Sequence, residues 1–187
     1  MSYDFELFRP APEMDLTRAL EQFHQEEEAR VVSGAATPYD EAKEFAKKKI
    51  RDVLLHHNAK LIVTESHSKA KENSLEDCEK KSATVIQFDE PEEIGTGLQI
   101  TLSDDSANVT VPYWHLAGEA NAVFHEVWDY LLILEDEGGF RTYDPQVDHV
   151  LDLRLDFEKV ALTYMRTSRA MAPTLAGKTE KPWWKFW

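Results

Sequence analysis

The chain has 187 residues, of which 42% are hydrophobic and 30% charged, a composition typical of a folded globular protein rather than a disordered one. Its 35 acidic residues outnumber 21 basic ones and give a formal net charge of −14, which argues against DNA or RNA as the main partner, because binding to phosphates depends on Lys and Arg. Cys78 is the only cysteine, which excludes an intrachain disulfide and a cysteine-rich metal site. The first residues lack the basic and apolar regions of a signal peptide, and no apolar run could span a bilayer, so we expect a cytoplasmic protein with no membrane span.

The first elements predicted are a strand and a helix. Residues 3–7 alternate apolar and acidic side chains, as a half-buried strand does. Asp15 is a suitable N-cap for a helix that places Leu16, Ala19, Leu20 and Phe23 on one face. The far end of this helix carries Glu26–Glu28, and we expect it to fray because the helix dipole disfavours anions there.

A second helix is predicted to run from Thr37, as N-cap, to about residues 57–58, with Pro38 in its first position. Lys47, Lys48 and Lys49 are expected on its solvated side. Its buried stripe is expected to consist of Ala42, Phe45, Ala46, Ile50, Val53 and Leu54.

The middle of the chain is polar and then β-prone. Residues 64–82 predict a long loop, with a short helix at 75–80, and residues 83–88 predict a strand. Residues 98–102 and 109–113 alternate cleanly around a turn at 104–106, which predicts a hairpin. Pro112 cannot donate to a strand ladder, so it is expected on an edge strand or at a strand exit.

A third helix is predicted over residues 117–136, ended by a left-handed glycine at Gly138 or Gly139. Its buried stripe is expected to consist of Ala120, Phe124, Val127, Leu131 and Leu134. Strands at 140–143 and 149–153 follow, and Asp152 or Asp156 is expected to start a last helix. Clustered strands joined by short turns favour an α+β fold, a mostly antiparallel sheet of five to six strands with three to four helices packed on it. We expect one domain over residues 1–172 and an aromatic C-terminal tail over 173–187.

Two clusters are candidate binding residues. Tyr113, Trp114 and His115 follow a strand exit and suit either a pocket lining or the core. Arg141, Tyr143, Asp144 and Gln146 surround one turn. Asp144 before Pro145 favours a structural turn, and the alternative is a polar rim for a partner.

His125, Glu126 and Asp129 form the one motif with metal-site spacing. Residues four apart share a helix surface, so His125 and Asp129 could face one ion with Glu126 as a base. The zinc-protease pattern, however, has His at both ends. We therefore favour the interpretation that these are polar positions opposite the buried stripe, and we predict no cofactor.

The last residues are aromatic and locally basic. Trp183, Trp184 and Trp187 accompany Lys181 and Lys185, so the tail is expected to fold back onto the same chain or to dock on another subunit or a partner. An interfacial membrane anchor is the third and least favoured alternative, because the segment is short.

Three segments together resemble small uncharacterised bacterial proteins, some of which are immunity-type partners that neutralise toxins of secretion systems. The segments are residues 2–8 (SYDFELF), residues 111–114 (VPYW) and residues 138–146 (GGFRTYDPQ). The resemblance implies a cytoplasmic protein-binding role and carries over no catalytic residue.

The function expected first is therefore a non-enzymatic, acidic protein-interaction module that binds a basic protein. The alternatives are a metal-dependent hydrolase that uses His125, Glu126 and Asp129, with His115 or His149 as a further ligand, and a small-ligand module in which Tyr113, Trp114 and Trp128 line a pocket.

Overall fold

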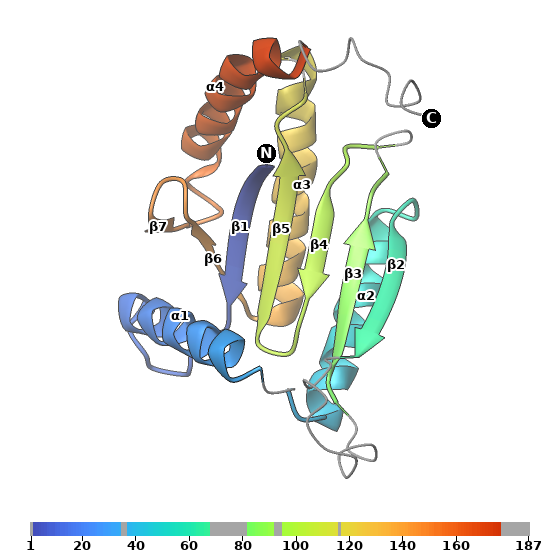
Figure 1. Ribbon diagram of the computed structural model, residues 1–187, viewed down its shortest axis with the longest axis vertical. Coiled ribbons are helices and arrows are strands. Elements are labelled where there is room, and N and C mark those ends of the chain that lie inside the picture. The colour runs from blue at the N-terminus through green and yellow to red at the C-terminus, as the bar shows by residue number, and fades with distance from the viewer. Residues whose placement is uncertain (1, 35–36, 68–81, 92–94, 116, 177–187) are drawn as a thin grey trace.

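One antiparallel sheet runs through the computed structural model, with α2 and α3 behind it in the view of Figure 1. The structure describes residues 2–34, 37–67, 82–91, 95–115 and 117–176. The strands are β1 (Ser2–Phe8), β2 (Ile62–His67), β3 (Thr84–Asp89), β4 (Gln99–Leu102), β5 (Ser106–Pro112), β6 (Arg141–Asp144) and β7 (His149–Val150). The helices are α1 (Leu16–Ser33), α2 (Glu41–His57), α3 (Ala117–Gly138) and α4 (Phe157–Ala176). None of these helices is long and apolar enough to cross a membrane.

The α+β prediction is confirmed, but the sheet has seven strands, in the order β2-β3-β4-β5-β1-β6-β7. The additional strand is β2, where we predicted a loop from residue 64. All six of its residues pair with β3, yet only Val63 is even half-buried. Because edge pairing rather than burial makes this strand, no apolar alternation marks it in the sequence. The helix predicted at 75–80 lies outside the described residues.

The core lies between the sheet and a layer made of α2, α3 and α4. In β1, Tyr3, Phe5 and Leu7 point into this layer and are fully buried. The apolar stripe predicted for α3 is confirmed, since Phe124, Val127, Leu131 and Leu134 are all fully buried. Gly139 caps the end of α3 in the left-handed region, as predicted, with φ at 67°.

Helix α1 lies on the other face of the sheet, at the corner formed by β1, β6 and β7 (Figure 1). The predicted cap is confirmed, because the Asp15 carboxylate accepts hydrogen bonds from two amides of the first turn. The fraying predicted at Glu26–Glu28 is wrong, and the helix continues to Ser33. Arg30 in the last turn pairs with Glu27, and Gly34 closes the helix by donating a 2.9 Å hydrogen bond from its amide to the Arg30 carbonyl.

Helix α2 begins later and faces the core differently than predicted. Asp40, not Thr37, is its N-cap, and the side chain accepts from the amides of residues 42 and 43. Phe45, predicted to be buried, is 74% exposed, whereas Lys47, predicted to be solvated, is fully buried. The prediction failed because an ammonium was assumed to require water, and here the protein supplies its partners.

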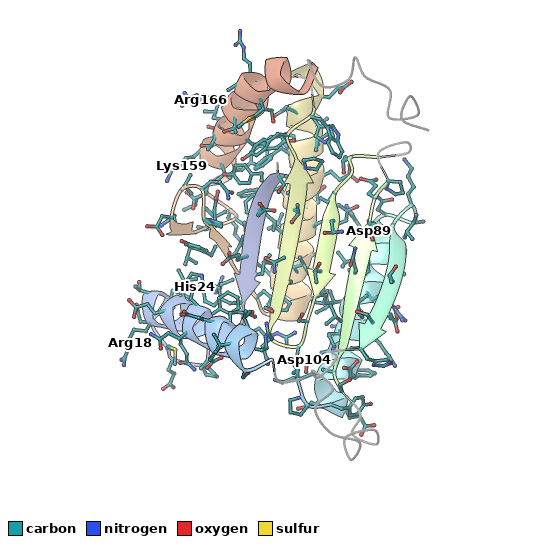
Figure 2. The ribbon with its side chains drawn as sticks, in the orientation of Figure 1. Arg18, His24, Asp89, Asp104, Lys159 and Arg166 are labelled. Carbon is teal, nitrogen blue, oxygen red and sulfur yellow. The ribbon has the colours of Figure 1, made fainter. Side chains whose placement is uncertain are left out.

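Those partners come from three elements at the foot of the sheet. The Lys47 ammonium lies 2.8 Å from Glu44 Oε1 and 2.5 Å from Asp104 Oδ1, and it donates to the main-chain carbonyl of Thr84. Glu44 and Asp104 are themselves buried, and Asp104 lies in the turn between β4 and β5 (Figure 2). Arg9 holds the same turn from the other side, donating to the Asp104 carbonyl at 2.6 Å. These contacts attach α2 and β1 to the β4–β5 hairpin.

We expect Lys47→Met to lower the free energy of unfolding by about 3–5 kcal/mol, because it leaves two buried carboxylates without their cation. Lys48→Met, on the exposed side of the same helix, is the matched control and should change stability by less than about 0.5 kcal/mol. Urea unfolding of both variants measures the difference. Equal stabilities would show that the ion cluster does not hold the hairpin.

Candidate functional site

The face of the sheet opposite the core, which is towards the viewer in Figure 1, is covered by a helix of the described residues only at the corner where α1 lies. Side chains alternate along a strand, so the residues between the buried positions of β1, β3, β4 and β5 all stand on this side. We call it the open face and define it by eight residues. They are Asp4, Glu6, Gln87, Asp89, Gln99, Thr101, Asn108 and Thr110.

The strand register arranges these eight side chains in two parallel rows. Along the Asp4 row, Asp4 pairs with Thr110, Thr110 with Gln99, and Gln99 with Asp89. The remaining four residues form the Glu6 row in the same way, from Glu6 on β1 to Gln87 on β3. Seven of the eight are half-buried and Asn108 is exposed, so their polar ends reach solvent. The two rows carry three carboxylates and no lysine or arginine.

Neighbouring donors fix the carboxylates of the open face. Asp89 accepts from the side-chain amides of Gln99 at 2.7 Å and Gln87 at 3.0 Å. Asp4 accepts from the Ser2 hydroxyl at 3.1 Å. Glu6 lies 3.1 Å from the ring of His24, which reaches over from α1 (Figure 2). These contacts limit the side-chain freedom of the three carboxylates, which lowers the entropic cost of a further interaction.

Trp114 lies at the margin of the open face and is 43% exposed. Its indole packs over Gly97, where a Cβ would come within 2.4 Å of Cζ2, and Gly97 also has a positive φ of 70°. Only glycine fits under this ring. An exposed indole fixed beside polar rows is a feature typical of protein interfaces.

The other members of the predicted Tyr113-Trp114-His115 cluster are buried. Tyr113 stacks on Tyr164 with ring centroids 5.8 Å apart, and burial raises the pKa of its hydroxyl. His115 is 8% exposed, with Nε2 2.8 Å from the Thr96 carbonyl oxygen. Trp128, the third aromatic of the ligand-pocket alternative, donates from Nε1 to the Leu153 carbonyl at 2.8 Å. The structure therefore does not bring Tyr113, Trp114 and Trp128 together around one cavity.

The four turn residues are likewise divided between the two faces. Asp144 is fully buried on the core side, where it accepts from the Tyr3 hydroxyl at 2.6 Å and the Gln146 amide at 2.8 Å. Burial raises the pKa of Asp144, and the Tyr3 hydrogen bond opposes this effect. Tyr143 lies on the open side but under α1, with its hydroxyl donating to Asp148 at 2.7 Å. Gln146 and Arg141 are exposed.

The residues of the metal-type motif point to different neighbours. The exposed His125 ring packs on Phe157 of α4, with centroids 4.4 Å apart. Glu126 faces the opposite helix, α2, where the Asn58 side chain donates to it at 3.1 Å. Within the described ranges, no three His, Cys, Asp or Glu side chains form a group that could hold a metal ion.

Glu126 instead belongs to a carboxylate pair that sequence reasoning missed. The Asn58 amide, at the C-cap of α2, donates both to Glu126 and to Glu90 at 3.0 Å. Burial, followed by the nearby Glu90 charge, raises the pKa of Glu126. Burial acts in the same direction on Glu90, but hydrogen bonds from Thr96 and Asn58 outweigh it and hold the pKa of Glu90 below its usual range. Nothing in the sequence marks the pair, because Asn58 is 32 residues from one carboxylate and 68 from the other.

Trp183, Trp184 and Trp187 of the predicted tail lie outside the described residues. No protein-family model, curated protein or solved structure with which the chain was compared matches it.

We expect Glu126→Gln to stabilise the protein above the ordinary pKa of a glutamate. A raised pKa means that folding favours the protonated form, so the stability of the wild-type protein falls as pH rises from that ordinary value through the raised one. Glutamine stays neutral at every pH, so the variant does not lose stability in this way as pH rises. Thermal unfolding over a pH series measures the effect, and a variant less stable than wild type at neutral pH would contradict it.

Glu90→Gln should act in the opposite direction, and we expect it to lower the free energy of unfolding by about 2 kcal/mol at neutral pH. The charged acceptor of the Thr96 amide, the Thr96 hydroxyl and the Asn58 amide is lost. Because the pKa of Glu90 is lowered, its contribution is present above the ordinary pKa of a glutamate and is lost as pH falls through the lowered one. The two variants should therefore differ from wild type with opposite signs at neutral pH.

Proposed function

We propose that this chain is a non-enzymatic, cytoplasmic protein of the immunity type that binds a basic protein partner through the open face of its sheet. The observation that carries the proposal is the open face itself. Its two rows present three carboxylates and no lysine or arginine, and no helix in the described part of the chain lies over them.

The charge of the whole chain supports the same partner. A net charge of −14 attracts a basic protein over a distance of about 8 Å in physiological salt and raises the rate of encounter. It repels nucleic acid, whose phosphates carry the same sign. Trp114, exposed beside the rows, adds a rigid apolar contact of the kind found in interface hot spots.

The proposal is tested by capture of partners from the lysate of the native host, followed by mass spectrometry at low and high salt. We expect a basic protein that is retained at low salt and lost at high salt. The variant Asp4→Asn/Glu6→Gln/Asp89→Asn should lose it. The matched control is Glu119→Gln/Asp129→Asn/Asp136→Asn, which changes the charge by the same amount on exposed positions of α3 and should retain the partner.

For an immunity-type role, the captured protein should also arrest growth when it is expressed alone, and co-expression of this chain should relieve the arrest. A captured partner that binds the open-face variant as well as wild type, or a partner with no effect on growth, would contradict the proposal.

A further inference from the structure

We infer that the open face binds an extended basic segment of its partner, which lies across the strands and places two basic side chains four residues apart on Asp4 and Asp89. The inference rests on the proposed function and specifies the chemistry and conformation of the bound segment.

The two anchors are singled out by what surrounds them. Asp4 and Asp89 are the two carboxylates of the Asp4 row, with Thr110 and Gln99 between them, and the register continues past Asp89 to Ile62 of β2. The third carboxylate of the open face, Glu6, lies 3.1 Å from His24 Nε2 of α1, so a side chain of another element already contacts it. Of the two rows, the Asp4 row is also the one farther from α1, which covers the corner where Phe8 and Tyr143 lie.

The distance between the anchors follows from the strand order. Two strands, β4 and β5, separate β3 from β1, so Asp89 and Asp4 are three strand spacings apart, or about 14 Å. An extended chain advances about 3.4 Å per residue, and its side chains alternate in direction, so residues i and i+4 lie on one side and about 14 Å apart. This spacing matches the row.

A helix does not match the same spacing. Residues on one helix face recur at i+7, about 10.5 Å along the axis, and at i+11, about 16.5 Å, whereas the residue nearest 14 Å, at i+9, points to the opposite side. The geometry therefore selects an extended segment over a helical one.

Both anchors are pre-organised for a cation. The Gln87 and Gln99 amides fix Asp89, and the Ser2 hydroxyl fixes Asp4. Little side-chain entropy remains to be lost when a guanidinium binds. A segment with the matching spacing therefore binds more tightly than one whose basic side chains reach only one of the two carboxylates.

Two synthetic peptides of the same length and composition test the inference. Both are fluorescein-labelled, capped at their ends and built from alternating Thr and Val to favour extended chains. One carries Arg at i and i+4, and the other carries Arg at i and i+7. Fluorescence anisotropy at about 50 mM salt should show binding of the first peptide to the full chain at least about tenfold tighter than the second.

Asp4→Asn/Asp89→Asn should abolish this preference. Asp129→Asn/Asp136→Asn, with the same change in charge on exposed positions of α3, should keep it to within roughly twofold. All four positions are exposed or half-buried, so both variants are expected to fold. Thermal unfolding of each variant verifies this.

Equal affinity of wild type for the two peptides, or equal loss of the preference in both variants, would overturn the inference. If the basic partner is nevertheless captured at low salt and lost by the open-face triple variant, the proposed function stands and only the two-anchor geometry fails. Failure of the partner capture together with failure of both peptides to bind would overturn the function as well.

Discussion

The alternation of side chains along β1 is the constraint on which both the apolar core and the open face depend. β1 lies inside the sheet, paired with β5 along its whole length and with β6 over three residues. Its odd-numbered residues Tyr3, Phe5 and Leu7 are fully buried against the helical layer. Asp4 and Glu6 must then stand on the opposite face, because a one-residue slip in register would bury both carboxylates and expose the three apolar side chains. The apolar core and the open face are both consequences of the register in which β1 pairs with β5.

Buried polar contacts then attach the helical layer to particular points of the sheet. Apolar burial supplies most of the stability but has no direction. At the foot of the sheet, Lys47 of α2 joins Asp104 of the β4–β5 turn. Elsewhere, Tyr3 of β1 joins Asp144 of β6, and Asn58 joins Glu90 to the middle of α3 through Glu126. Each contact joins segments far apart in the chain, so each is satisfied in one arrangement of strands and helices and left unpaired in the others.

The sequence was sufficient to predict an element wherever that element buries one face and exposes the other. The alternation in β1, the apolar stripe of α3 and the turn of the β4–β5 hairpin predicted their elements to within a few residues, and the Asp15 cap located the start of α1. The sequence predictions were wrong where the partners of a residue come from distant segments of the chain. β2 is a strand through pairing with β3, and Lys47 is buried because Asp104, 57 positions further along the chain, meets its ammonium. No local pattern contains that information.

The same limit applies to the candidate site. Alternation shows that Asp4 and Glu6 share a strand face, but not whether a helix covers that face or which residues of β3 continue the row. Among the residues predicted for binding, Trp114 is exposed at the margin of the open face, whereas Tyr113, His115 and Asp144 are buried in the interior. An aromatic or acidic residue beside a turn suits the core and an interface equally well, and only the packing around it separates the two.

In the proposed function, the net charge of the whole chain governs the rate of association, and the carboxylates of the open face govern its specificity. The net charge acts at long range and would attract any basic protein, an effect that salt weakens. The carboxylates of the Asp4 row act only at contact. In the proposed complex, the spacing of the partner's basic side chains decides whether both Asp4 and Asp89 are paired or one is left desolvated without a cation. An acidic chain can therefore meet many basic proteins quickly and still retain few of them, because retention depends on a distance that the strand order sets.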